Sequence, residues 1–233
     1  FFYSIPSSFP LLSVSLRMDK LSAFFVFIIS LSVALCSLYA FGYVAHYYKK
    51  YSIGALGFFY NIFILGMVAV AMANNALFFL IVWELMSLAS YFLVIYERHN
   101  SDNVRAGYVY FVMTHFGTAF IIALFILLYH FTGSLDFTEM KGHLALASPL
   151  LAGVLFVLAL VGFGTKAGII PFHIWLPSAH PAAPSHVSAL MSGVMIKTGV
   201  YMLIRVTLGI LPEINLWWGL LIMIVGASSA VLG

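Results

Sequence analysis

Three ionisable side chains lie inside long apolar runs of the sequence: Glu84, Lys166 and Lys197. A charge at the centre of a bilayer costs about 2.5–3.5 kcal/mol on insertion scales, so each group needs a partner, water or a neutral state. A carboxylate that moves toward or away from a buried amine changes whether that amine holds a proton. These residues therefore predict a proton relay. A structural ion pair is the alternative, although it leaves the second lysine unexplained.

Four histidines extend this set of titratable groups: His115, His173, His180 and His186. His186 and Lys197 are 11 residues apart, which on an ideal α-helix is only about 20° from the same face and about 16.5 Å along the axis. We therefore expect one helix to carry both groups along a polar path. For each histidine, a packing role and a place on the path are both open.

Other site chemistries have little support. The single cysteine, Cys36, excludes a disulfide, a thiolate metal site and an iron–sulfur cluster within this chain. His173, His180 and His186 lack a fourth zinc ligand, and the prolines between them forbid the continuous helix that a bis-histidine haem site would need. We expect no metal, no cofactor and no catalytic residues in this chain.

The composition identifies the solvent in which these groups lie. Of the 233 residues, 64% are hydrophobic and 7% charged, whereas soluble domains have about 45–50% and about 25%. The 10 basic and 7 acidic residues cannot cover the surface of a soluble globule, so the lipid bilayer must surround most of the chain. The basic residues form no stripe, which argues against nucleic acid as a partner.

Charged and turn-forming residues divide the chain into seven apolar stretches, each about as long as a membrane-spanning helix. The expected fold class is all-α, a polytopic transmembrane helix bundle with short connections. Residues 132–148 form the one longer connection, which suits a short amphipathic helix at the interface. The expected spans are 21–45, 54–73, 76–96, 105–131, 149–176, 185–208 and 214–233.

The fifth stretch, 149–176, is too long to be one continuous span. As a helix it would extend about 42 Å, beyond a hydrocarbon core of about 30 Å. Gly164 and Gly168 loosen the run, and Pro171 and Pro177 remove backbone donors. We expect a discontinuous helix, which in transporters lines a cavity that holds the ion site.

Three motifs also carry a family likeness. Residues 83–87 read WELMS, residues 164–184 read GTKAGIIPFHIWLPSAHPAAP, and residues 188–201 read SALMSGVMIKTGVY. Together they resemble the proton-conducting, antiporter-like membrane subunits of the respiratory complex I superfamily. The wording is most similar to the large antiporter-like subunit (component B type) of group 4 membrane hydrogenases, the hydrogenase-4 and formate hydrogenlyase type.

The resemblance implies a fourteen-helix fold of two inverted five-helix repeats, of which this chain would be a fragment. Residues 1–20 would be a loop and the remnant of an N-terminal region, and residues 21–53 a transmembrane helix and loop. Residues 54–208 would form the complete first repeat, with the broken helix near 164–177. Residues 209–233 would begin the second repeat.

The resemblance also implies roles for the buried charges. Glu84 would match the family's helix-borne glutamate, Lys166 the central lysine on the broken helix, and Lys197 the group that passes protons onward. His173 lies in the family's Pro-X-His-X-Trp-Leu-Pro pattern, and its role is open.

The expected function is a proton-translocating subunit of a membrane-bound oxidoreductase, with Na+ as the alternative ion. Its partners would be other membrane subunits and a peripheral electron-transfer module, in a bacterial or archaeal inner membrane. Two alternatives stay open: a subunit of a stand-alone multisubunit Na+/H+ antiporter, and a membrane scaffold that does not conduct.

Overall fold

The fold is an all-α transmembrane bundle, as the composition predicts. The computed structural model describes residues 1–6, 13–144, 148–211 and 215–232. Within these residues, six helical segments are long and apolar enough to cross a membrane, and one further apolar helix is shorter. The helices are α1 (Lys20–Tyr43), α2 (Ile53–Met72), α3 (Ala76–Val94), α4 (Ser101–Thr132), α5 (Phe137–His143), α6 (Pro149–Ala167), α7 (Leu176–Ala182), α8 (Ser185–Leu190), α9 (Ile196–Ile204) and α10 (Leu216–Leu232).

Side-chain caps begin most of the spanning helices, because the first N–H groups of a helix need acceptors. Asp19 accepts from the N–H of Ser22 at the start of α1, and Asn75 accepts from two N–H groups of α3. Ser52, Asn100 and Ser148 cap α2, α4 and α6 in the same way. Polar residues that interrupt the apolar runs therefore determine where the spans start.

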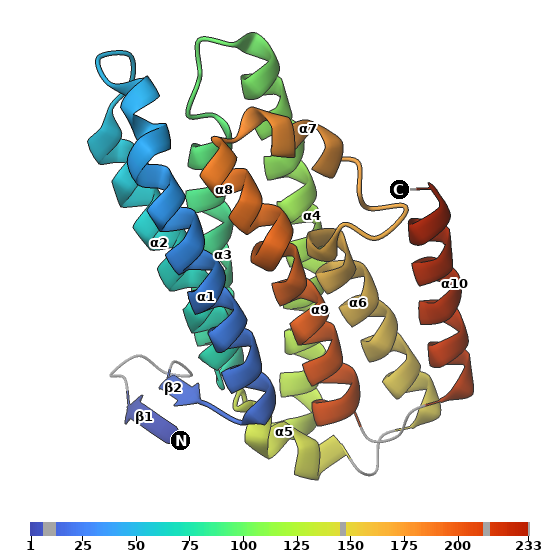
Figure 1. The fold of residues 1–233 in the computed structure, drawn as a ribbon. Coiled ribbons are helices and arrows are strands. Elements are labelled where there is room, and N and C mark those ends of the chain that lie inside the picture. Colours follow the sequence, from blue (N-terminus) through green and yellow to red (C-terminus); the bar gives the residue numbers. More distant parts are fainter. Residues whose placement is uncertain (7–12, 145–147, 212–214, 233) are drawn as a thin grey trace.

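The spanning helices pack side by side in a bundle, in which α6 and α9 are neighbours (Figure 1). Contacts run from α1 to α2, from α2 to α3, from α3 to α4 and from α4 to α6; α6 then packs on α9, and α8 packs on α1. The segment 185–210 is not a uniform helix, because α8 and α9 are separated by a π-helical segment, Met191–Met195, and α9 is followed by a second one, Arg205–Ile210.

Two close contacts between backbones hold α6 in the centre. A Cβ atom at Gly162 would lie 3.1 Å from the carbonyl oxygen of Gly117 on α4, and one at Gly199 on α9 would lie 2.6 Å from the carbonyl oxygen of Phe163. Small residues at such crossings allow helices to pack closely in lipid, where no hydrophobic force drives them together. This packing places the C-terminal end of α6 between its neighbours.

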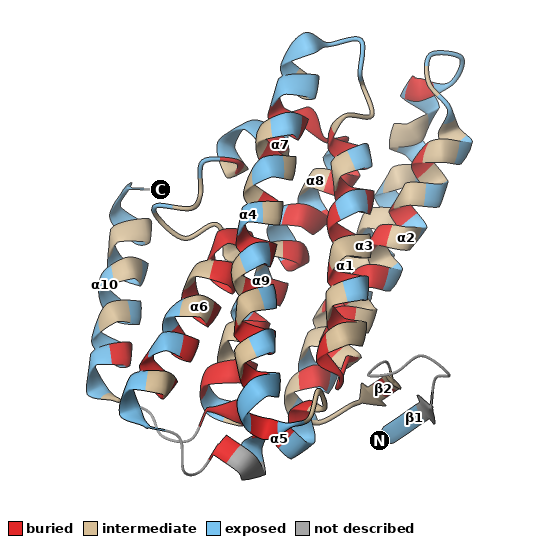
Figure 2. Cartoon of the chain, turned by 180° about the vertical axis from the view of Figure 1, so that it is seen from behind, coloured by how far each residue is buried: buried red, intermediate tan, exposed pale blue. Residues whose placement is uncertain are grey.

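Buried residues gather on the inner faces of the bundle, and the outer faces are exposed (Figure 2). Helix α10 lies at the edge, where Trp218 is its single buried residue among those described and stacks on Phe156 of α6 at 4.7 Å. The exposed faces carry large apolar side chains, such as Phe41, Phe58 and Leu150. That pattern is expected where lipid or another subunit covers a helix.

The N-terminal residues form a pair of strands, and the longer connection between α4 and α6 contains a short helix. Residues 1–20 were expected as a loop, but they contain an antiparallel pair of strands, β1 (Phe2–Pro6) and β2 (Ser13–Arg17). The pair is fixed to the α2–α3 turn, because Ser13 Oγ accepts a hydrogen bond from the Asn75 side chain and the Ser15 carbonyl accepts one from the Asn74 N–H. The short helix expected within residues 132–148 is α5, and residues 145–147 lie outside the described part.

Candidate functional site

The break in the fifth span lies at Gly168, where α6 ends. Gly168 adopts the left-handed conformation, with φ of 72°, which glycine adopts without strain. The N–H of Ile169 donates to the carbonyl of Gly164 at 3.1 Å, and a Cβ at Gly164 would collide with the Ile169 side chain. The indole N–H of Trp175 donates to the carbonyl of Thr165 at 2.9 Å. These bonds satisfy carbonyls that the broken helix leaves free.

The expected discontinuity is therefore present, although glycine rather than proline ends the helix. Pro171 lies beyond the end of α6, between it and α7. Pro177 lies in the first turn of α7, where a missing N–H costs nothing. The break places Lys166 in the last turn of α6, deep inside the bundle.

Lys166 is almost completely buried, with 2% of its surface exposed. Its Nζ donates to Ser87 Oγ on α3 and to the phenolic oxygen of Tyr110 on α4, both at 3.0 Å. The same nitrogen lies 5.7 Å from the centre of the Trp83 ring and 5.3 Å from that of Tyr110, within reach of cation–π attraction. We call Ser87, Tyr110 and Trp83 the Lys166 cage.

The cage offers Lys166 two hydroxyl acceptors. Ser87 donates its own proton to the Trp83 carbonyl at 2.9 Å, and Ser90 donates to carbonyls of α3 while it also bonds Tyr110. An uncharged amine has two N–H donors and an ammonium has three. The cage by itself therefore satisfies the uncharged amine, and an ammonium requires a further partner.

Glu84 lies on the same helix as Ser87, three residues earlier, but its carboxylate points to other partners. Its Oε1 accepts from the hydroxyl of Thr118 at 2.7 Å, and its Oε2 lies 3.3 Å from Nε2 of His115. The other ring nitrogen of His115, Nδ1, lies 2.9 Å from the carbonyl oxygen of Phe111, and this contact orients the ring. Both side chains are partly exposed, at 29% for Glu84 and 40% for His115.

Glu84 and Lys166 do not form an ion pair in this structure. Among the described residues no lysine lies within ion-pair distance of Glu84, whose carboxylate lies beside the His115 ring, and Asp19 pairs with Arg205. The structural alternative, in which Glu84 is bound to a lysine, is therefore wrong for this conformation. The structure instead gives them separate partners: Glu84 contacts His115 and Thr118 of α4, and Lys166 contacts Ser87 of α3 and Tyr110 of α4.

Lys197 lies away from Lys166. It is exposed on α9, and its Nζ donates to the Ser192 carbonyl. His186 is buried at 2% exposure, between the rings of Tyr43 and Tyr60. The segment 185–210 carries both residues, as expected, but His186 is buried and Lys197 is exposed. A π-helical segment lies between them, so the spacing of an ideal α-helix does not describe how they face.

The two histidines near the break are separate from the cage. His180 Nδ1 lies 3.4 Å from Ser188 Oγ, and its ring stacks on Trp175. Burial lowers the pKa of His180 below its ordinary value; the bond with Ser188 opposes this change, and the positive charge of Lys197 adds to it. His173 is half-buried, and its Nδ1 is buried with no hydrogen-bond partner in the described part of the chain.

Sequence reasoning missed the residues that contact the two central charges. Ser87 and Tyr110 were not anticipated, because a hydroxyl inside an apolar run has no spacing signature of its own. Thr118 also contacts the site, through its bond to Glu84. Ser87 could have been found from its position one turn after Glu84. The approach of Tyr110 to Lys166 depends on how α4 packs on α6.

The part of the chain that holds this site matches a known protein family. Residues 73–233 match the family model described as NADH:quinone oxidoreductase/Mrp antiporter, TM. This chain belongs to that family. The match includes both the broken helix and the lysine cage, so the site lies within the family's shared region.

Members of the NADH:quinone oxidoreductase/Mrp antiporter family with known names include hydrogenase-4 component B of Escherichia coli strain K12. It is 49% identical over 227 residues, which are 97% of this chain and 33% of that protein. The chain thus spans about a third of the length of this relative. It is an antiporter-like membrane segment, and its relatives are subunits of multisubunit membrane complexes.

Two solved structures have the same fold. The Mrp complex from Dietzia sp. DQ12-45-1b matches 100% of this chain and 25% of its own with a TM-score of 0.87 and 24% identity. The archaeal membrane-bound sulfane sulfur reductase complex matches 96% of this chain and 44% of its own, with a TM-score of 0.80 and 22% identity. These likenesses confirm the antiporter-like fold.

Proposed function

We propose that the full-length protein is an ion-translocating, non-redox subunit of a membrane-bound oxidoreductase of the hydrogenase-4 or NADH:quinone oxidoreductase type. H+ is the proposed ion and Na+ the alternative. A peripheral module would carry the electron-transfer chemistry, and this chain would hold no cofactor. The proposed location is a bacterial or archaeal inner membrane.

The observation that carries the proposal is a lysine buried in a transmembrane bundle with two hydroxyl acceptors and, within the described part of the chain, no carboxylate partner. Burial of an ammonium without a counter-ion is costly. Lys166 therefore needs Glu84, or water, whenever it is charged. A group whose charge depends on the position of another side chain suits proton transfer.

The proposed cycle starts from the arrangement described above, with Glu84 paired to His115 and Thr118. When Glu84 swings toward the cage, Lys166 gains a counter-ion and a third acceptor, so the amine takes up a proton. When Glu84 returns to His115, the ammonium loses that partner and releases its proton. Each step adds one proton to the Lys166 amine or removes one from it, and no other covalent bond changes.

The released proton would leave toward α9. The Tyr110 hydroxyl lies 3.7 Å from the Met195 sulfur, at the π-helical segment that precedes Lys197. Lys197 would receive the proton on the exposed side of α9, through water, and pass it to the part of the protein that follows. His173, His180 and His186 would connect the cage to the end of the bundle near α7.

The test compares ion movement in inverted membrane vesicles that contain the full-length protein in its complex. Lys166→Ala and Glu84→Gln should each abolish proton uptake when the complex receives its electron donor, while Lys141→Gln, an exposed lysine on α5, should leave it intact. Assembly is checked by the amount of complex in the membrane. Undiminished pumping in both variants would exclude the relay and favour a scaffold.

A stand-alone Na+/H+ antiporter is a second candidate, because the family model covers Mrp antiporters as well. Moving one charge against 100 mV requires about 2.3 kcal/mol, which either electron transfer or a sodium gradient could supply. The same vesicles distinguish the two sources. An antiporter responds to a sodium pulse without an electron donor, and an oxidoreductase subunit responds to the donor.

A further inference from the structure

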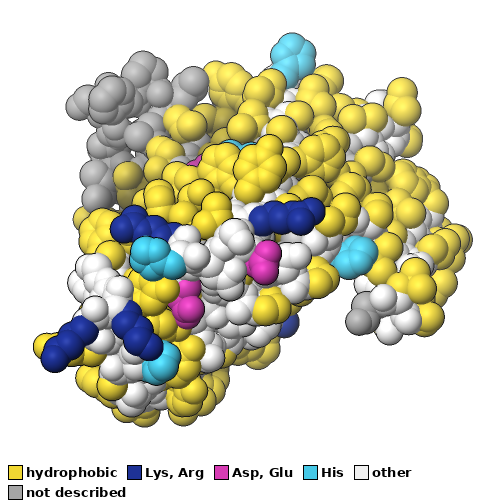
Figure 3. Space-filling model, turned by 90° about the horizontal axis from the view of Figure 1, so that it is seen from above, with side chains coloured by type: hydrophobic (Ala, Val, Ile, Leu, Met, Phe, Trp, Pro, Cys, Tyr) yellow, Lys and Arg dark blue, Asp and Glu magenta, His cyan; other side chains and the backbone are white. Residues whose placement is uncertain are grey.

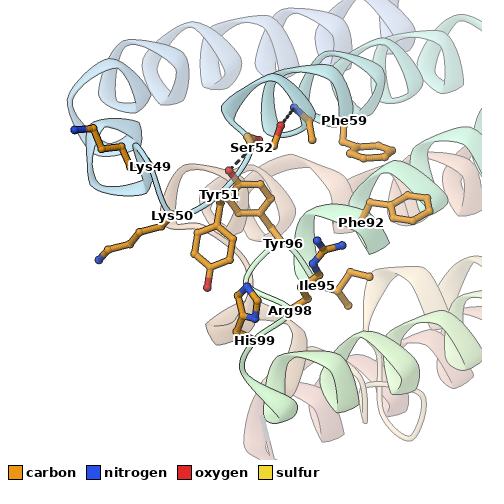
Figure 4. Close-up of a pocket in the computed structure, with 11 residues that line it drawn as sticks. Lys49, Lys50, Tyr51, Ser52, Phe59, Phe92, Ile95, Tyr96, Arg98 and His99 are labelled. Carbon is orange, nitrogen blue, oxygen red and sulfur yellow. Dashed lines mark hydrogen bonds between the residues drawn. The ribbon is translucent and has the colours of Figure 1, made fainter.

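A cavity of about 450 Å³ lies at the end of the bundle where α2 begins and α3 ends. Figure 4 shows its two ends: Lys49 and Lys50 lie at one end, Phe59 and Phe92 lie at the other, and Arg98 and His99 lie below. The cavity is remote from the Lys166 cage and shares none of its residues. Figure 3, which looks onto this end, shows basic, histidine and acidic side chains beside a largely apolar surface.

The polar end of the cavity has an unbalanced positive charge. Lys49, Lys50 and Arg98 line it, and no carboxylate lines it among the described residues. The nearest acidic residue in sequence, Glu97, accepts a hydrogen bond from the Tyr47 hydroxyl at 2.7 Å and belongs to another contact. The cations on this part of the wall favour an anionic ligand over a neutral or cationic one.

The loop that carries Lys49 and Lys50 is held by contacts with the segment that follows α3. Lys49 has a φ of 68°, a left-handed conformation that is uncommon for lysine. The Tyr96 hydroxyl donates to the Ser52 carbonyl at 3.1 Å, and the ring of Tyr51 packs on those of Tyr96 and His99 at 5.3 and 5.7 Å. The two Tyr rings form a floor between the cations and the apolar end.

The apolar end lies on the transmembrane wall. Phe59 is six residues into α2, about 9 Å below the helix start, and its ring stacks on that of Phe92 of α3 at 4.6 Å. Phe92 is 41% exposed, and Phe58, which precedes Phe59 in the chain, is 60% exposed. A ligand in this cavity would therefore meet positive charge at the membrane surface and aromatic rings directly beneath it.

We propose that this cavity binds an anionic phospholipid, with its phosphate against Lys49, Lys50 and Arg98 and an acyl chain along Phe59 and Phe92. A phospholipid has the same order of groups: its charged headgroup lies at the membrane surface, and its apolar chains lie beneath it. Basic clusters at the ends of transmembrane helices attract anionic headgroups. Free phosphate would use only the polar end, and a neutral lipid only the apolar one.

The test uses the full-length protein in vesicles of phosphatidylcholine and phosphatidylglycerol, with one phosphatidylglycerol bearing a photoreactive group near its ester linkages. Labelled peptides are mapped by mass spectrometry. Labelling should concentrate on the peptides that contain Phe59 and Phe92. The variant with Lys49→Gln, Lys50→Gln and Arg98→Gln should reduce it about tenfold or more, while Arg17→Gln, Lys20→Gln and Lys141→Gln at the other end of the bundle should leave it unchanged.

Two competition arms identify the chemistry. Unlabelled phosphatidylglycerol should abolish the labelling, and inorganic phosphate or glycerol phosphate should not, because both lack the acyl chain. Equal labelling by a photoreactive phosphatidylcholine, or equal loss in both triple variants, would overturn the proposal. A photoreactive amino acid in place of Tyr51 that crosslinks in native membranes to a protein and not to lipid would likewise overturn it, in favour of an acidic partner segment.

Discussion

The Nζ of Lys166 lies 3.0 Å from the phenolic oxygen of Tyr110, so the lysine of the broken helix is bound by a hydroxyl of α4. Tyr110 is completely buried and also bonds Ser90. This contact joins the C-terminal turn of α6 to α3 and α4. Any change in the charge of Lys166 therefore acts on three helices at once.

Tyr110→Phe should impair ion translocation and keep the ring packing. The variant removes one of the two acceptors of Lys166, and the loss of a hydrogen bond to a charged group costs about 1.5–3 kcal/mol, or roughly a tenfold to hundredfold change in rate. Proton uptake in vesicles is the measurement. Tyr91→Phe is the control, because no hydrogen bond of its hydroxyl occurs in the described part of the chain. Normal uptake in Tyr110→Phe would remove the hydroxyl from the relay.

Thr118→Val should alter the position of Glu84 and leave its charge unchanged. The hydroxyl that donates to Glu84 Oε1 at 2.7 Å is lost, so we expect proton uptake to fall about tenfold and to recover in Thr118→Ser. Thr114→Val is a matched control one turn away, since Thr114 donates to the carbonyl of Phe111. A loss of similar size in Thr114→Val would point to a general packing defect.

Gly199→Ala should destabilise the bundle. The added Cβ would lie 2.6 Å from the carbonyl oxygen of Phe163 and 2.9 Å from the backbone nitrogen of Ala167, and backbone atoms cannot move aside cheaply. Overpacking of this kind costs about 1–3 kcal/mol, which thermal unfolding of the purified full-length protein in detergent should detect. Gly219→Ala, with no atom within 4 Å of the added carbon, should leave the Tm unchanged.

The ion pair between Asp19 and Arg205 should make stability depend on acidity. Burial alone raises the pKa of Asp19, but the N–H of Ser22 and the guanidinium of Arg205 together hold it below its ordinary value. A carboxyl group with a lowered pKa stabilises the fold above its unfolded pKa of about 3.9, and that contribution is lost as the pH falls through the lower folded value.

We therefore expect the Tm of the wild type to fall more steeply below about pH 4 than that of Asp19→Asn. At neutral pH, Asp19→Asn should have the lower Tm, because Arg205 is buried at 8% exposure and loses its charged partner. Asp102→Asn, at an exposed carboxylate, should follow the wild type. Parallel pH curves for Asp19→Asn and the wild type would show that the pair does not contribute to the acid sensitivity.

Much of the fold followed from local chemistry. Five spans and the shorter α10 lie within a few residues of the expected stretches, because the length of an apolar run and the polar cap before it are local properties. The remaining span, α6, begins where the expected stretch 149–176 begins and ends at Ala167. The break at Gly168 was expected from the length of the run and its glycines. The strand pair at the N-terminus was missed, since its pairing with the α2–α3 turn depends on contacts between Asn75 and Ser13, which are 62 positions apart.

The sequence by itself determined that this chain spans a membrane, that its fifth span is interrupted, and that the ionisable groups of Glu84, Lys166 and Lys197 lie within apolar runs. These conclusions need only composition, spacing and the energy of burying an ion. Only the tertiary structure decided which groups meet: Lys166 meets Ser87 and Tyr110, and Glu84 meets His115 and Thr118. Those contacts depend on how closely α3, α4 and α6 pack. The direction in which Lys197 points depends on the π-helical segment before it, which the spacing of residues in the sequence does not reveal.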